Sequence, residues 1–282
     1  DNQSTFGSGG AISFDVLTAG YLVQVQNSRF EDNEAGQDGG AISAEGADFV
    51  SVTDTVFIRN RAPLGAGGAL FLDANEDQAF LRCRFHANLA DDAGGAVAEE
   101  HSTGTSEFEN CVFTENIGNT GGAVYRRTAA IQADIVNNTF AGNSALTDGA
   151  HLYLDESAVS FVNNIAWGGV DGGGLYVEDA PAASASDFYY NDVGNNSGGD
   201  YTGALSDPTG TSGNINNDPL FRDYTVDGDE DNDDLYLAPG SPCMNTGDPS
   251  IADVDGTRSD IGAFGGPNAE ADDGDSDGHY DI

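Results

Sequence analysis

The chain has 282 residues, enough for one large all-β domain or two smaller ones, and it carries 48 acidic residues against nine basic ones, all of them arginine. A formal net charge of −39 excludes nucleic acid as an expected partner, because phosphates would be repelled, and it disfavours an anionic membrane surface. Cations are the expected partners, either as screening salt or as bound calcium.

The composition predicts a folded chain. Hydrophobic residues make up 38% of the sequence, they recur periodically, and 15 Phe and 10 Tyr are available for a core. The 39 Gly indicate many tight turns. Abundant Asp without lysine resembles the composition of proteins from salt-loving organisms. No apolar run reaches the ~18 residues that a membrane span needs, so no membrane span is expected.

Two short motifs recur in step along the chain. Gly-Gly-Ala or a close variant begins at Gly9, Gly39, Gly67, Gly94, Gly121, Asp148 and Gly172. The motif Phe-x-x-Asn keeps the same spacing at Phe30–Asn33, Phe57–Asn60, Phe85–Asn88, Phe113–Asn116 and Phe140–Asn143. Two motifs in register over five periods indicate internal structural repeats.

The repeats predict a right-handed parallel β-helix. Short runs such as YLVQVQ (21–26), FVSVTD (49–54) and ALFLD (69–73) are typical of strands, and the Gly-free 3.6-residue periodicity of helical repeats is absent. Two or three strands with turns would make one coil, and coils would stack ~4.8 Å apart. We expect seven to nine coils.

Stacking would place equivalent residues of successive coils directly above one another. The five repeat Phe side chains would then form an interior column, and the five repeat Asn side chains would form a hydrogen-bonded corner. The Gly pairs would form a second corner, where a positive φ or a close backbone approach is required.

The GGA[ILV] and FxxN motifs resemble the repeats of chlamydial polymorphic outer membrane proteins and of bacterial secreted right-handed β-helix proteins, over residues 9 to about 145. GNINNDPLFRDY (213–224), YLAPGSPCMNTGDP (236–249) and DIGAFGGP (260–267) resemble the closing segment of secreted pectate-lyase-like β-helix proteins. The resemblance implies the fold and export to the cell exterior or outer cell surface more than it implies an activity.

We therefore predict an all-β chain, a parallel β-helix with an irregular C-terminal cap. Residues 1–180 would form the repeat coils, residues 181–268 the final coils and a loop-rich cap, and residues 269–282 an Asp-rich tail. Little material is expected to cover the N-terminal end, which leaves that end open to another chain.

One predicted column is acidic. The fifth residue counted from the Ala of each Gly-Gly-Ala motif is Asp15, Glu45, Asp73, Glu100, Arg127 or Glu178, and Asp155 fits after a one-residue slip. Arg126 and Arg127 would lie one coil above Glu99 and Glu100. The simplest interpretation is a solvated acidic face with ion pairs. These same four residues are the weak catalytic candidates, because polysaccharide lyases on β-helices combine calcium-binding Asp residues with an Arg or Lys base.

The tail offers a candidate calcium site. Asp273, Asp275 and Asp277 followed by Gly278 match the opening of a D-x-D-x-D-G calcium loop, and Asp281 is a further candidate ligand. A plain acidic linker is an equal alternative. The run VDGDEDNDD (226–234) lacks Gly at the sixth place and is interpreted as a solvated charge run.

The cysteines and histidines give weaker signals. Cys83 and Cys111 would be stacked neighbours within reach of a disulfide, although buried free thiols are favoured, and Cys243 has no evident partner. The four His residues share no repeat phase, so a zinc site has little support.

The expected function is an extracellular or cell-surface structural or adhesive β-solenoid that self-associates through its coil ends into a filament. Two alternatives stay open. One is a carbohydrate-active enzyme, a polysaccharide lyase or hydrolase, that uses the acidic column with Arg126 or Arg127. The other is a calcium- or glycan-binding module without catalysis. The expected partners are cations, copies of the same chain and polysaccharide.

Overall fold

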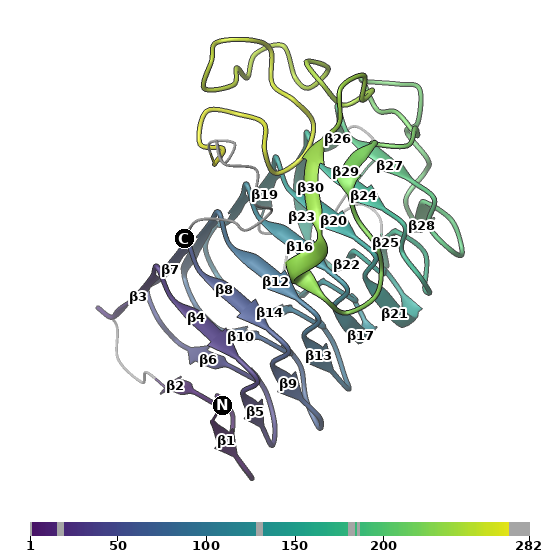
Figure 1. Cartoon of the computed structure of the whole chain (residues 1–282). Coiled ribbons are helices and arrows are strands. Elements are labelled where there is room, and N and C mark those ends of the chain that lie inside the picture. The colour runs from purple at the N-terminus through teal and green to yellow at the C-terminus, as the bar shows by residue number, and fades with distance from the viewer. Residues whose placement is uncertain (1, 16–19, 128–131, 180–183, 185–186, 271–282) are drawn as a thin grey trace.

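The computed structural model describes residues 2–15, 20–127, 132–179, 184 and 187–270. Within this part the chain winds into stacked coils, and the strands of successive coils pair in parallel to form four long sheets (Figure 1). Each repeat coil contributes four strands, not the two or three predicted. The additional strand is as short as two residues, as in Arg61–Ala62, and such a strand is too short to show alternation in the sequence.

The first two sheets flank the Gly-pair corner. Sheet A contains β1 (Gln3–Ser4), β5 (Glu34–Ala35), β9 (Arg61–Ala62), β13 (Leu89–Ala90), β17 (Ile117–Thr120) and β21 (Ser144–Asp148). Sheet B contains β2 (Ile12–Asp15), β6 (Ile42–Glu45), β10 (Leu70–Asp73), β14 (Val97–Glu100), β18 (Val124–Arg127), β22 (Leu152–Asp155), β25 (Leu175–Val177) and β28 (Tyr201–Gly203).

The other two sheets carry the aromatic core. Sheet C contains β3 (Leu22–Gln26), β7 (Phe49–Thr53), β11 (Asp77–Leu81), β15 (Ser106–Glu109), β19 (Gln132–Val136), β23 (Ala158–Val162) and β26 (Phe188–Tyr189). Sheet D contains β4 (Arg29–Glu31), β8 (Val56–Ile58), β12 (Arg84–His86), β16 (Val112–Thr114), β20 (Thr139–Ala141), β24 (Ile165–Trp167) and β27 (Asp192–Gly194). The C-terminal segment adds the antiparallel pair β29 (Phe221–Asp223) and β30 (Asp234–Leu237), with the 3-10 helix η2 (Glu230–Asn232) between them.

The predicted Phe column is confirmed. Phe85 pairs with Phe57 on one side and Phe113 on the other, and their ring centroids lie 4.9 and 4.8 Å apart. The rings are nearly parallel, which is a consequence of identical side chains at identical positions of an in-register stack. The column ends at Ala166, where Phe161 of sheet C packs on Phe140 instead, at 6.1 Å.

The predicted Asn corner is also confirmed. Asn88 donates from Nδ2 to Oδ1 of Asn116 at 2.9 Å and to the carbonyl of Phe57 at 2.9 Å, and its backbone N–H donates to the same Asn116 oxygen. A second ladder, absent from the predictions, runs along the corner between sheets C and D through Asn138, Asn164, Asn191 and Asn214. Each ladder satisfies buried backbone groups that no strand partner reaches.

The Gly pairs are required for both of the predicted reasons. Gly94 has φ +65°, which side chains rarely adopt. A Cβ on Gly95 would lie 2.1 Å from the carbonyl oxygen of Gly122 in the next coil. The first Gly of the pair therefore provides the turn, and the second allows two coils to approach at the corner.

The thiols are buried and reduced, as favoured from the sequence. Cys83 and Cys111 occupy the position that Asn138 takes in the next coil, and both are free. Cys243 has a partner that the sequence does not indicate: its thiol donates to Oδ2 of Asp192 at 3.0 Å. Burial raises the pKa of Asp192 to about 6, although the hydrogen bonds from Cys243 and the backbone of Asn217 oppose this shift.

Most of the C-terminal segment lies along the flank of the β-helix and not over its end. Leu205 packs on the core of the last coil. From Phe221 onward the chain returns across the outer face of sheet D, where Val112, Ala141, Leu235 and Ala263 form an apolar cluster (Figure 1). This return buries the apolar part of the outer face of sheet D.

Candidate functional site

The predicted acidic column lies on the outer face of sheet B. Asp15, Glu45, Asp73, Glu100, Arg127 and Asp155 are aligned strand by strand. Partial burial raises the pKa of Glu45, and the charges of Asp15 and Asp73 raise it further. Repulsion of this kind is expected where carboxylates stack at strand spacing.

Two side chains contact carboxylates of the column, the guanidinium of Arg127 and the imidazole of His101. Nε of Arg127 lies 3.2 Å from Oδ2 of Asp155, and Nδ1 of His101 lies 2.9 Å from Oδ1 of Asp73. The side chains of Arg127 and His101 are both more than half exposed, so each contact contributes little to stability. The column is therefore a solvated acidic face with ion pairs, as its simplest interpretation predicts.

Arg126 and Glu99 are not on this face. Their ion pair, with Nε 2.8 Å from Oε2, lies inside the β-helix, and neither side chain is exposed to solvent. Side chains alternate between the two faces of a strand, so Arg126 points inward where Arg127 points outward. The four catalytic candidates are thereby divided, and Arg126 and Glu99 cannot contact a polymer on the surface.

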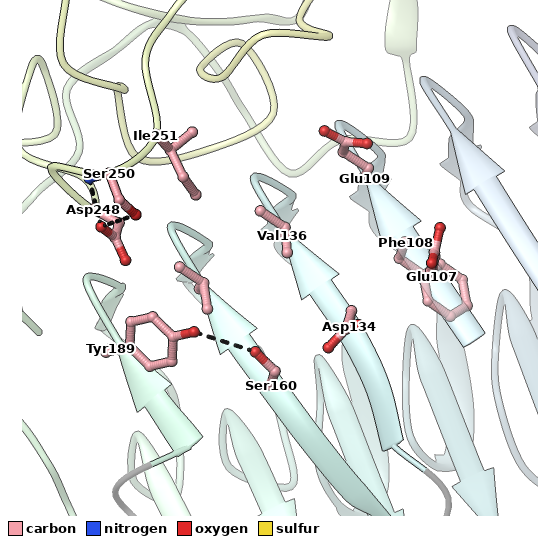
Figure 2. A pocket seen from close by; sticks show the side chains of 11 residues that line it. Glu107, Phe108, Glu109, Asp134, Val136, Ser160, Tyr189, Asp248, Ser250 and Ile251 are labelled. Atoms are coloured by element: carbon pink, nitrogen blue, oxygen red, sulfur yellow. Dashed lines mark hydrogen bonds between the residues drawn. The ribbon is translucent and has the colours of Figure 1, made fainter. Parts of the chain in front are cut away.

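A cleft of about 350 Å³ lies on a different face, between sheet C and the loop at residues 248–251. Its floor is formed by outward side chains of neighbouring strands: Glu107 of β15, Asp134 of β19 and Ser160 of β23 are aligned in register. Figure 2 shows Glu107 and Asp134 on adjacent strands and Tyr189 at the far end of the row. Asp248, Ser250 and Ile251 form the opposite wall.

Hydrogen bonds hold both walls of the cleft in place. The backbone N–H of Asp248 donates to Oδ1 of Asn163 at 2.6 Å, which fixes the loop to a corner of the β-helix. Oδ1 of Asp248 in turn accepts from the backbone and hydroxyl of Ser250 at 2.8 and 2.7 Å. The hydroxyl groups of Tyr189 and Ser160 lie 3.5 Å apart (Figure 2).

The lining combines acceptors with apolar surface. Glu107, Glu109, Asp134 and Asp248 supply carboxylates, whereas Val136, Val162, Ile251 and the ring of Tyr189 supply apolar area. The lining residues in the described part of the chain include no Arg or Lys. Such a cleft can accept hydrogen bonds from hydroxyl or ammonium groups and can pack against their carbon skeleton.

The sequence does not reveal this cleft. Its floor belongs to the repeat, but its second wall comes from the C-terminal loop at residues 248–251, outside the repeat. The available signal is the pair Glu107 and Asp134, at positions where earlier coils carry Ser51 and Ala79. Acidic residues in two consecutive coils, at a repeat position that is small in earlier coils, indicate that the outer face of sheet C has different neighbours there.

The candidate calcium ligands Asp273, Asp275, Asp277 and Asp281 lie outside the described residues, so calcium stays a prediction. Among the residues described, His86, Glu115 and Asp233 form a group that could hold a metal ion, and it lies against sheet D, away from the cleft. No helix in the described ranges is long and apolar enough to cross a membrane.

Residues 3–140 match the family model described as "Right handed beta helix region". The match and the four parallel sheets together establish the predicted fold class, an all-β parallel β-helix. No curated protein and no solved structure matches the chain. This fold is compatible with surface structural proteins and with carbohydrate-active enzymes. The finer resemblances, to polymorphic outer membrane protein repeats and to pectate-lyase-like closing segments, stay predictions.

Proposed function

We propose that the protein is an extracellular adhesive β-solenoid that binds a neutral or cationic polysaccharide in the cleft between sheet C and residues 248–251. The observation that carries the proposal is the cleft itself, in which carboxylates and a Tyr ring share one surface. The regular coils then serve as a rigid scaffold that displays this surface.

The chemistry of the lining suits a sugar. Sugar hydroxyls donate hydrogen bonds, and hydrogen bonds to an ionised acceptor are stronger than those between neutral groups. Glu107 and Asp134 present such acceptors on neighbouring strands. The apolar face of a sugar ring packs on aromatic and aliphatic side chains, which Tyr189 and Ile251 provide.

Charge narrows the class of glycan. With a net charge of −39 and four carboxylates around the cleft, the protein would repel a polyuronate. A neutral glycan is tolerated, and an amino sugar is attracted. This argument disfavours a polysaccharide lyase, whose substrates are anionic. The burial of Arg126, one of the two candidate bases, also disfavours it.

The test is calorimetric titration with neutral, cationic and anionic oligosaccharides: glucan, mannan, chitosan and polygalacturonate fragments. We expect binding in the first two classes, with a Kd that rises roughly 10- to 100-fold in Asp134→Asn, because a hydrogen bond to a charged group is lost. Asp91→Asn, an equal change of charge at an exposed site outside the cleft, should leave Kd unchanged. Equal affinity in both variants, or binding confined to polygalacturonate, would refute the proposal.

A hydrolase is the second candidate. Glu107 and Asp134 are in-register neighbours, and strand spacing of ~4.8 Å is near the ~5–5.5 Å between the carboxyl groups of retaining glycosidases. The same titrations, followed by a reducing-end assay over days, separate the two candidates. Turnover that disappears in Glu107→Gln would favour the enzyme, whereas binding without product supports an adhesive protein.

Self-association into filaments is a separate proposal. β1, β2, β3 and β4 are the edge strands of the four sheets, and Leu22 of β3 is 55% exposed. Edge strands of this kind can pair with another chain. Light scattering with and without salt and calcium tests the idea, and monomers under every condition would exclude it.

A further inference from the structure

The returning C-terminal segment brings four ionisable side chains together on the flank of the β-helix. His86 ends β12, and Glu115 follows β16 in the next coil. Glu230 and Asp233 come from η2 and its C-cap, more than a hundred residues later. One ligand atom each of His86, Glu115 and Asp233 lie within 4.8 Å of one another, and Oε2 of Glu230 lies 3.8 Å from Nε2 of His86.

In each of the three carboxylates, one oxygen accepts a hydrogen bond and the other does not. Oε2 of Glu115 accepts from the backbone N–H of Gly228 at 2.8 Å, and Oδ1 of Asp233 accepts from that of Thr225 at 3.1 Å. Oε1 of Glu230 accepts from Nη2 of Arg29 at 2.9 Å. The remaining oxygens, Oε1 of Glu115, Oδ2 of Asp233 and Oε2 of Glu230, are buried without a hydrogen-bond partner.

The imidazole of His86 likewise has one nitrogen with a hydrogen-bond partner and one without. Nδ1 of His86 lies 3.0 Å from Oγ1 of Thr114, its in-register neighbour on β16. When Nδ1–H donates to this hydroxyl oxygen, Nε2 carries the free lone pair that a metal ion requires. Nε2 is buried and has no hydrogen-bond partner, and only 4% of the residue is exposed. Buried polar atoms are almost always satisfied, so four unsatisfied atoms in one place indicate a missing partner.

Electrostatics agree with the geometry. Burial raises the pKa of Asp233 to about 7, and the neighbouring carboxylates of Glu115 and Asp227 raise it further, against a hydrogen bond from the Thr225 backbone. Burial also raises the pKa of Glu115. Carboxylates that repel one another in a desolvated place are relieved by a bound cation.

The geometry points to a divalent transition-metal site, with Nε2 of His86, Oε1 of Glu115, Oε2 of Glu230 and Oδ2 of Asp233 as ligands. One imidazole and three carboxylates suit a four-coordinate ion such as Zn²⁺. Ca²⁺ fits less well, because it takes six to eight oxygen ligands and no imidazole. The hydrogen bond that His86 donates to Thr114, and those that the carboxylates accept from Gly228, Arg29 and Thr225, are the supporting shell that fixes ligand orientation.

The site would fasten the returning segment to two successive coils of the β-helix. Two ligands belong to coils and two to the segment, so the ion bridges parts of the chain that are otherwise joined through apolar contacts, hydrogen bonds and the ion pairs of Arg29 and Arg84. Metal binding then stabilises the docked segment, and the melting temperature rises with the free metal concentration. The segment also supplies the wall of the glycan cleft, but the metal site does not depend on glycan binding.

The experiment uses the full chain, stripped with a chelator and titrated with Zn²⁺, Co²⁺ or Ca²⁺. We expect one tight equivalent of Zn²⁺ by mass spectrometry and calorimetry, a rise in melting temperature, and visible Co²⁺ absorption typical of nitrogen and oxygen ligands. Asp233→Asn should weaken Zn²⁺ binding by more than the roughly 10- to 100-fold typical of changes outside the ligand set. Asp231→Asn, an exposed residue of the same segment, should bind as tightly as the wild type.

Glu115→Gln provides a second variant on the coil side, for the case in which Asp233→Asn does not fold, and circular dichroism verifies the fold of each variant. Protease protection of residues 224–233 on adding Zn²⁺ should be lost in both variants. Absence of saturable Zn²⁺ binding, or equal binding by Asp233→Asn and Asp231→Asn, would overturn the proposal. Tighter Ca²⁺ than Zn²⁺ binding at these residues would also overturn it, because the imidazole would then have no role.

Discussion

Arg126 and Glu99 form an ion pair in the interior of the β-helix, with 2.8 Å between Nε and Oε2 and no exposure of either side chain. The aligned positions in the two flanking coils are both leucine, Leu72 and Leu154. The pair therefore interrupts a column of apolar residues at one point.

We expect removal of one partner to be costly and removal of both to be tolerated. Glu99→Leu leaves a buried guanidinium without its counter-ion and should cost about 3–5 kcal/mol, whereas Glu99→Leu with Arg126→Leu extends the leucine column and should be neutral or more stable. Urea unfolding of the wild type, of Glu99→Leu, of Arg126→Leu and of the double variant gives the four free energies of a double-mutant cycle. A double variant as unstable as either single one would show that the pair contributes net stability.

Phe85→Ala should destabilise the protein by about 3–5 kcal/mol, because it leaves a gap between two stacked rings in a fully buried column. The matched control is Leu64→Ala, which removes another large apolar side chain at a site that is 82% exposed and should change stability by less than ~0.5 kcal/mol. Chemical denaturation measures both changes. Equal effects would contradict the stacked interior.

Glu45→Gln should be neutral or slightly stabilising at pH 7. The pKa of Glu45 is raised by burial and by Asp15 and Asp73, so the ionised form is less stable in the folded chain than in the unfolded one. Because the pKa of Glu45 is higher in the folded chain than in the unfolded one, the gain in stability from Glu45→Gln is present at neutral pH. It vanishes below both pKa values, near pH 3, where the carboxyl group is neutral in both states. Glu34→Gln, which removes an exposed carboxylate that faces Arg61 at 3.8 Å, should give no gain. Thermal unfolding at both pH values distinguishes them.

His151 should make the protein acid-sensitive. Its pKa is lowered to about 4 by complete burial, against a hydrogen bond to Asn196. Its neighbours are neutral: Oδ1 of Asn196 lies 2.8 Å from Nε2, Nδ2 of Asn143 lies 3.2 Å from Nδ1, and the Phe140 ring packs beside it.

Since the folded pKa is below the unfolded value, stability from the neutral imidazole is complete above about pH 6.5 and is lost as the pH falls toward 4, by roughly 3 kcal/mol in all. The stability difference between wild type and His151→Gln, measured by urea unfolding in constant salt at pH 7 and pH 4.5, should therefore shrink or reverse at the lower pH. A stability difference that does not change with pH would refute the assignment of the acid sensitivity to His151. Carboxylates that titrate equally in both proteins cancel in this difference.

The interior of the coils could be predicted from the sequence because each layer repeats the one before. Phe57, Phe85 and Asn88 are found where the period places them, since an in-register stack leaves no other arrangement. The sequence aligns Arg126 with Glu99 of the preceding coil, and the structure has this alignment. The sequence does not indicate that the pair is buried: alternation along β18 puts Arg126 on the face opposite Arg127, inside the β-helix.

The outer surfaces could not be predicted in the same way. The run at residues 226–234 predicts that Asp233 is solvated, yet only 5% of it is exposed, because the returning segment places it against β12 and β16. The wall of the cleft at Asp248 has the same origin. Both sites need contacts between repeat and non-repeat parts of the chain, and periodicity carries no information about such contacts.

The returning segment changes how the coils depend on one another. Coils in a plain stack touch only their nearest neighbours, so an end can fray without disturbing the middle. Here Arg29, Asn110 and Asn163, from the first coil to the sixth, bond to Glu230, Ala263 and Asp248 of the returning segment. Unfolding of one coil therefore removes contacts of the returning segment, which also holds distant coils. We expect the coils to unfold together in a single cooperative transition, and not one after another from the ends.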